Sequence, residues 1–184
     1  MKLYHSSFSI ITDPDLKHGR VNADFGQGFY LSPDKEFVLR WSKRHYGKKT
    51  YINEYELDTE NLDIWTFVRD TKWLSYILHN RSRLPDSLKT CDAILGPIAN
   101  DTIYDTWGII SSGLFPEEET LQLGPEYKQL VVKSEKALKQ LKWIDAEELS
   151  DDLLSRYKET VRKEEQDYQT AFSKLMEELD SSAI

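Results

Sequence analysis

After Pro125 the chain contains no further proline or glycine, and this absence constrains the fold of its last third more than any other feature. From residue 145 onward, apolar side chains recur at spacings of three, four and seven, which is typical of one face of an α-helix. These positions are Leu149, Leu153, Tyr157, Val161, Tyr168, Phe172, Leu175 and Leu179. We therefore expect residues 145–184 to form one long helix, in which roughly thirty residues at a rise of 1.5 Å per residue would reach about 50 Å.

The negative charge of the chain is concentrated in the same segment. Of the net charge of −8, −7 belongs to residues 145–184, so residues 1–144 are nearly neutral. This balance argues against nonspecific DNA binding by the whole chain. We expect a main domain over residues 1–144 and an acidic amphipathic helical extension over residues 145–184. The extension either packs along the main domain or contacts a second copy or another protein, and the sequence leaves these alternatives open.

The sequence also limits the compartment and the kind of site. The single cysteine, Cys91, cannot form a disulfide within the chain, which suits a reducing cytoplasm. No signal-peptide pattern begins the chain, and no apolar run reaches the roughly 20 residues of a membrane span. Histidine and cysteine clusters with metal-site spacing are absent. We expect a cytoplasmic protein that uses neither a membrane nor a metal.

Strand and helix patterns in residues 1–144 do not alternate regularly. The strand patterns cover residues 2–4, 27–31, 51–57, 92–95, 129–133 and 141–144. One helix pattern follows Ser32-Pro33, a pair that suits a helix start. Further helix patterns cover residues 70–80, 103–110, 120–123 and 134–138. Because the elements do not form βαβ repeats and no glycine-rich turn opens a helix, the sequence predicts an α+β fold and not a doubly wound one.

The segment from Asp24 to Ser32 carries the most informative local pattern. Gly26 and Gly28 flank one residue and precede the pair Phe29-Tyr30, which enters a strand. Glycine at these positions lets the backbone pass close to a neighbouring group, and Tyr30 would present its ring for stacking on a ligand. Taken singly, Tyr30 is an ordinary strand aromatic, and a lone histidine near a terminus is more often structural than catalytic.

Three separated motifs in a fixed order resemble the ADP-ribosyltransferase superfamily, and most closely its PARP and diphtheria-toxin branch. The motifs are Tyr4-His5-Ser6, then Gly26-Gln27-Gly28-Phe29-Tyr30-Leu31-Ser32, then Gln129-Leu130-Val131-Val132. That branch carries a second aromatic residue eleven positions after its tyrosine, where this chain has Trp41. The resemblance covers roughly residues 3–144 and is closest to an uncharacterised bacterial family assigned to the superfamily.

The resemblance implies a split β-sheet core and cleavage of the nicotinamide–ribose bond of NAD, which passes through an oxocarbenium-like transition state. It implies that His5, Tyr30 and Gln129 are the catalytic residues. Arg20 would meet the diphosphate, and Tyr30 and Trp41 would hold the nicotinamide ring. The full set of residues implied to bind NAD is Ser6, Ser7, Arg20, Asn22, Gly28, Phe29 and Trp41.

The chain departs from the pattern of that branch at Ser6, where glycine is usual, and at Gln129, where glutamate is usual. A neutral amide accepts a ribose hydrogen bond but does not act as a base, so we expect Gln129→Glu to raise NAD hydrolysis. One hypothesis is a mono-ADP-ribosyltransferase of bacterial toxin or defence type, acting on a protein or nucleic acid and held by an antitoxin or second copy through residues 145–184. The alternatives are an NAD- or ADP-ribose-binding module without transfer activity, and a plain interaction protein.

Overall fold

The computed structural model describes residues 1–99 and 127–182. Within these ranges the chain forms seven strands in two sheets and four helices, which confirms the predicted α+β class. The helices predicted over residues 103–110 and 120–123 lie outside the described residues. The side chains of the predicted apolar stripe from Tyr168 onward also lie outside the part that the structure describes.

The first sheet contains β1 (Lys2–Ser7), β3 (Thr50–Leu57) and β7 (Leu141–Leu149), in the order β1-β3-β7, and all its pairs are antiparallel. The second contains β2 (Phe29–Leu31), β6 (Lys128–Val132), β5 (Ala93–Pro97) and β4 (Ile64–Thr66), in the order β2-β6-β5-β4. Only β4 and β5 run parallel. The strands thus divide into two sheets.

The last strand is longer than the sequence predicts, and the prediction of a helix from residue 145 was wrong. β7 continues to Leu149 because residues 145–149 pair with the first half of β3. Two of its acidic side chains form ion pairs at 2.8 Å, Glu147 with Lys35 and Glu148 with Lys49. The division expected between residues 144 and 145 therefore falls inside a strand.

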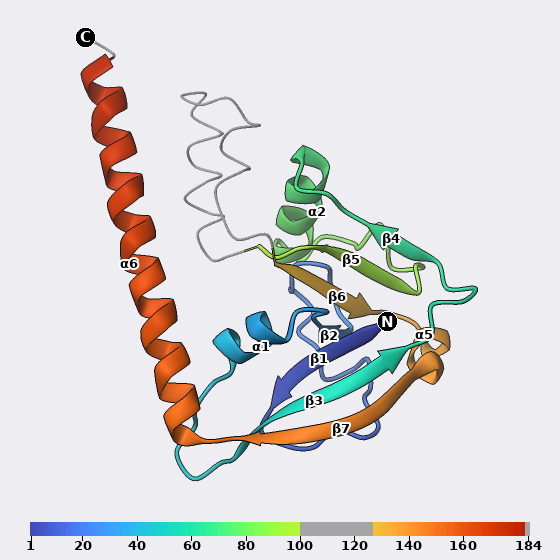
Figure 1. Cartoon of the computed structure of the whole chain (residues 1–184). Helices are drawn as coiled ribbons and strands as arrows, with labels where there is room; N and C mark the ends of the chain where they lie inside the picture. The colour runs from blue at the N-terminus through green and yellow to red at the C-terminus, as the bar shows by residue number, and fades with distance from the viewer. Residues whose placement is uncertain (100–126, 183–184) are drawn as a thin grey trace.

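The two sheets meet where β1 passes the end of β2. Tyr4 and Ser32 exchange backbone hydrogen bonds of 2.8 and 2.9 Å at this point. Leu3, Phe29 and Tyr55 belong to the apolar layer between the sheets. The helix α2 (Thr71–Arg81) covers the other face of the second sheet, and α1 (Lys35–Trp41) covers the other face of the first (Figure 1).

The start of α1 corrects another expectation. Asp34 caps the helix, since its carboxylate accepts a hydrogen bond of 3.2 Å from the backbone N–H of Phe37. The expected cap, Ser32, is held in the bridge to β1, and its hydroxyl donates to the Lys128 carbonyl at 2.7 Å. Ser32 therefore joins β1, β2 and β6 instead of starting the helix.

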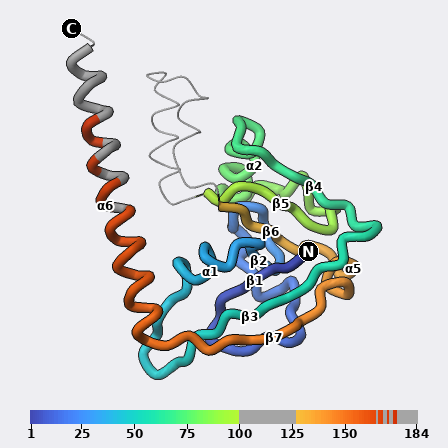
Figure 2. The backbone as a smooth tube through the Cα atoms, viewed as in Figure 1, coloured from blue at the N-terminus to red at the C-terminus, as the bar shows by residue number. Residues whose placement is uncertain are grey.

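After β6 the chain forms the short helix α5 (Glu135–Gln140), then β7, and then the 32-residue helix α6 (Asp151–Ser182). Leu154, in the first turn of α6, is buried with Val38, Ile52 and Leu149. Tyr157 donates a hydrogen bond of 3.0 Å to Glu36, on α1. Figure 1 and the tube in Figure 2 show α6 running past α1 and then away from the two sheets. No helix among the described residues is both long and apolar enough to cross a membrane.

Candidate functional site

His5 lies at the junction of the two sheets, in a defined tautomer. Its Nδ1 lies 2.7 Å from the carbonyl oxygen of Tyr30. A carbonyl only accepts hydrogen bonds, so Nδ1 carries the proton, and Nε2 of the neutral ring is left as an acceptor. Burial lowers the pKa of His5 below its ordinary value, although the bond to Tyr30 opposes this shift. Among the described residues we find no hydrogen-bond partner for Nε2.

Tyr30 directs its side chain to the face of the second sheet that α2 covers, where the half-buried ring packs beside Phe25 and Val131. Its hydroxyl accepts a hydrogen bond from the N–H of Phe25 and donates one to the carbonyl of Gly26, both at 2.8 Å. Burial raises the pKa of Tyr30 well above its ordinary value. The hydroxyl is therefore neutral and engaged with its own loop, so it is not available to a ligand.

The two glycines of the motif are required by packing within the chain. A Cβ at Gly28 would lie 2.4 Å from the Val132 carbonyl oxygen and 2.6 Å from a methyl group of Val131, both on β6. Gly26 has a φ of +78°, which side chains disfavour. A Cβ there would also lie 2.6 Å from a carboxylate oxygen of Asp86. The close approach inferred from the sequence is therefore an approach of β2 and its loop to neighbouring parts of the chain.

Gln129 shares a sheet face with Tyr30, since it lies two residues before Val131, the residue paired with Tyr30. The structure thus brings the three predicted catalytic residues to neighbouring positions. His5 bonds to the Tyr30 backbone, and Gln129 is diagonal to Tyr30 across the β2–β6 pair. The Gln129 amide also donates a hydrogen bond of 2.9 Å to the carboxylate of Asp24.

Sequence reasoning missed Asp24 and the residues that hold it. Arg81, on α2, forms an ion pair of 2.6 Å with Asp24, and Asn80 donates a hydrogen bond of 3.1 Å to the Asp24 carbonyl. The only signal in the sequence is that Asp24 directly precedes the Phe25-Gly26-Gln27-Gly28 segment. Nothing in the sequence joins it to a helix more than fifty positions later.

Sequence reasoning also missed a second contact that holds the same loop. Lys133, the residue after β6, donates a hydrogen bond of 2.7 Å to the Phe25 carbonyl and forms an ion pair with Asp86. Asp86 also accepts a hydrogen bond of 2.7 Å from the Tyr76 hydroxyl. Burial opposes ionisation of Asp86, but the bonds from Lys133 and Tyr76 outweigh it, so the pKa of Asp86 is lowered.

The remaining predicted NAD-binding residues occupy different environments. The Ser6 hydroxyl accepts a hydrogen bond of 2.8 Å from Ser42, at the end of α1, and the Ser7 hydroxyl accepts one of 3.1 Å from Asn53. Phe29 is buried against the His5 ring, with centroids 4.7 Å apart. Arg20, Asn22 and Trp41 are exposed, Trp41 to 47%. Among the described residues, the Trp41 ring packs against the Phe37 ring and makes no ring contact with Tyr30.

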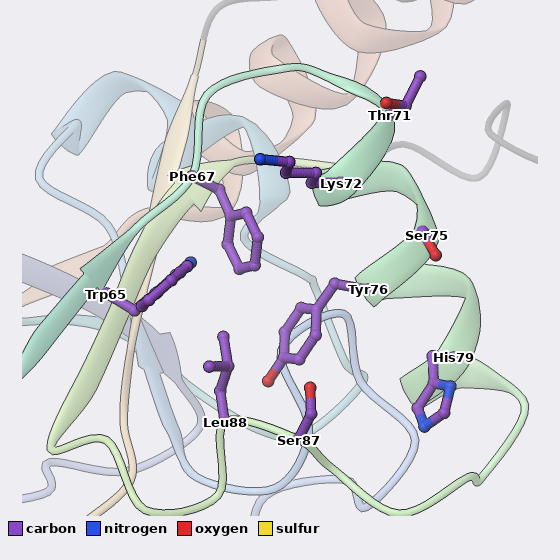
Figure 3. A pocket seen from close by; sticks show the side chains of 9 residues that line it. All are labelled: Trp65, Phe67, Thr71, Lys72, Ser75, Tyr76, His79, Ser87 and Leu88. Atoms are coloured by element: carbon purple, nitrogen blue, oxygen red, sulfur yellow. The ribbon is translucent and has the colours of Figure 1, made fainter.

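Two surface hollows lie elsewhere. One, of about 590 Å³, is lined by Trp65, Phe67 and Tyr76 together with Lys72 and other residues of α2 and the following loop (Figure 3). The other, of about 380 Å³, lies between residues 44–50 and 148–151. Neither hollow includes His5, Tyr30 or Gln129. Among the described residues, no group of three or more His, Cys, Asp or Glu side chains is arranged to hold a metal ion.

The acidic C-terminal segment is paired with basic residues of the main body. Arg40 forms a bidentate contact with Glu164 at 2.5 and 2.7 Å, and Arg44 pairs with Asp151 at 2.8 Å. Together with the pairs that Lys35 and Lys49 make to β7, these contacts neutralise part of the basic cluster over residues 35–49.

Comparison with known proteins gives one family. The family described as "Protein of unknown function (DUF3990)" matches residues 1–143 of the chain. The match includes β1, β2 and all of the residues that carry the site, and it ends inside β7. A search of curated proteins finds no match.

Proposed function

The chain belongs to the DUF3990 family, and we propose that it is an ADP-ribosyltransferase that binds NAD where its two sheets meet. The observation that supports the proposal best is the state of His5. Its Nδ1–H is committed to the Tyr30 carbonyl, so its Nε2 offers a fixed acceptor to a ribose hydroxyl. A lowered pKa keeps that acceptor unprotonated at neutral pH.

The surrounding residues suit the other parts of NAD. The exposed guanidinium of Arg20 can pair with the diphosphate, and the half-buried Tyr30 ring can contact the nicotinamide. Trp41 provides an exposed ring on α1. In this proposal the chain holds the ribose and the nicotinamide while the glycosidic bond breaks, and positioning supplies much of the rate.

The acceptor in this proposal is a macromolecule, either a protein or a nucleic acid, and the reaction takes place in the cytoplasm in a bacterial toxin or defence role. A neutralising protein or a second copy would bind the C-terminal segment. The form of α6 supports this part of the proposal, because the helix runs beyond α1 and away from the sheets (Figure 1).

Gln129 favours a second candidate, an NAD-binding protein without transfer activity. Its amide is neutral and donates to Asp24, so it provides neither a base nor a negative charge of its own. In this alternative the same residues bind NAD or ADP-ribose and leave the glycosidic bond intact.

Calorimetric titration with NAD tests the site shared by both candidates. His5→Gln should weaken NAD binding about tenfold, the equivalent of one hydrogen bond. His45→Gln, the same change at an exposed histidine, should leave the affinity unchanged. Equal affinities in all three folded proteins would contradict the site.

Mass spectrometry of a cell lysate incubated with the protein and NAD then separates the two candidates. Added ADP-ribose on protein or nucleic acid is the result expected of a transferase. NAD binding without nicotinamide release or added ADP-ribose would identify the binding module.

A further inference from the structure

We propose that Asp24, held by Arg81, is a positioning residue that orients the amide of Gln129 and supplies the negative charge that the strand position itself lacks. This inference rests on the proposed function, because it assigns a role in NAD cleavage. It concerns three residues that meet from three parts of the chain: the loop before β2, the end of α2, and β6.

Each oxygen of the Asp24 carboxylate has its own partner. Oδ1 lies 2.6 Å from Nη2 and 2.8 Å from Nε of Arg81, and Oδ2 accepts a hydrogen bond of 2.9 Å from Gln129. The side chains of Asp24 and Arg81 are only 12% and 13% exposed. The carboxylate is therefore fixed in place and largely shielded from solvent, where charge–dipole interactions are stronger than in water.

The contact fixes the orientation of the Gln129 amide. A carboxylate only accepts hydrogen bonds, so the NH₂ end of the amide must face Asp24, and the carbonyl end, Oε1, points elsewhere. Oε1 is then a fixed acceptor on the same sheet face as Tyr30. In the proposed reaction Oε1 accepts a hydrogen bond from a ribose hydroxyl. The negative charge of the Asp24 carboxylate, on the other side of the amide, stabilises the positive charge that develops on the ribose.

The same geometry changes the expectation for a glutamate at position 129. The carboxylate introduced by Gln129→Glu would lie against the Asp24 carboxylate, where the native amide donates its hydrogen bond. Two carboxylates at this distance repel each other and cannot both remain ionised without cost. We therefore no longer expect Gln129→Glu alone to raise NAD hydrolysis, although glutamate is usual at this position in the branch that the sequence resembles.

Exchanging the two groups preserves both the hydrogen bond and the charge. In the double variant Asp24→Asn/Gln129→Glu, an amide at position 24 donates to a carboxylate at position 129. One carboxylate, one amide and Arg81 remain, but the charge moves onto the strand. The double variant should therefore recover what each single change loses.

The experiment is a double-mutant cycle on nicotinamide release from NAD, using the full chain. Asp24→Asn and Gln129→Glu should each lower kcat about tenfold while KM for NAD changes by less than about threefold, because positioning acts on the bound substrate. The double variant should return to at least the wild-type kcat. Asp13→Asn, the same change at an exposed aspartate of the preceding loop, is the matched control and should leave kcat unchanged.

Thermal unfolding of the same proteins identifies any variant that fails to fold and gives a readout that does not need NAD. Gln129→Glu should lower Tm, and the exchange should restore it. If the wild type is active but the two substitutions are additive in kcat, or if Asp24→Asn behaves like Asp13→Asn, then Asp24 does not position Gln129. A wild type that neither binds NAD nor releases nicotinamide would instead overturn the proposed function itself.

Discussion

Removing the amino group of Lys133 should destabilise the protein far more than removing a similar group at the surface. The Lys133 side chain is 3% exposed and that of its partner Asp86 is 18% exposed. Lys133→Met leaves Asp86 charged and buried without a cation, which typically costs about 3–5 kcal/mol. In a chain of this size each kcal/mol lowers Tm by about 2–4 °C, so Tm should fall by about 6–20 °C.

Calorimetric or circular-dichroism melting measures this effect, with Lys49→Met as the matched control. Lys49 pairs with Glu148 at 2.8 Å, but the two side chains are 66% and 47% exposed, so the loss of the Lys49 amino group should cost less than about 1 kcal/mol. Lys133→Met/Asp86→Asn removes the unpaired charge and should recover part of the loss. If Lys133→Met and Lys49→Met melt at the same temperature, then the ion pair does not hold the loop that carries Phe25.

Two further predictions concern the junction of the sheets. Gly28→Asn should lower Tm strongly, because the new Cβ would lie 2.4 Å from the Val132 carbonyl oxygen of β6. Gly47→Asn is the control and should leave Tm nearly unchanged, because Gly47 has a φ of +74°, which asparagine tolerates, and nothing lies within 4 Å of its Cβ position. Equal Tm values for the two variants would refute the packing role of Gly28. Because burial lowers the pKa of His5 below 6.5, the unfolded chain takes up a proton that the folded chain resists, so stability should fall as pH drops below about 6.5. Urea unfolding across this range should show a flatter pH dependence in His5→Gln than in His45→Gln, and parallel curves would contradict the burial of His5.

The elements that the sequence predicts well are those whose side-chain pattern matches their burial. β3 is buried on both faces, with Ile52 on one face and Asn53, Tyr55 and Leu57 on the other, as its apolar pattern suggests. β4 escapes prediction because it is short and partly exposed, and its place depends on pairing with β5. The second half of β7 escapes it because acidic residues favour a solvated helix locally, while pairing with β3 and lysines distant in sequence decides otherwise.

The site divides in the same way. His5 and Tyr30 were predicted from motifs within short segments, and the structure joins them directly. The contact between Asp24 and Arg81 could not be predicted, since it depends on how α2 packs against the loop before β2. The tautomer of His5 could not be predicted from the sequence either, because it is set by a backbone carbonyl on another strand.

The single residue between β7 and α6, Ser150, gives the last helix a mechanical property. The helix follows the outer strand of the first sheet directly, its first turn is anchored by Leu154, and Tyr157 bonds to α1. At 1.5 Å per residue its 32 residues span about 48 Å, so a tilt of about 5° at the base moves the far end by about 4 Å. The helix is thus a lever arm, and a force applied to its end acts through β7 and β3 on β1, the strand that carries His5.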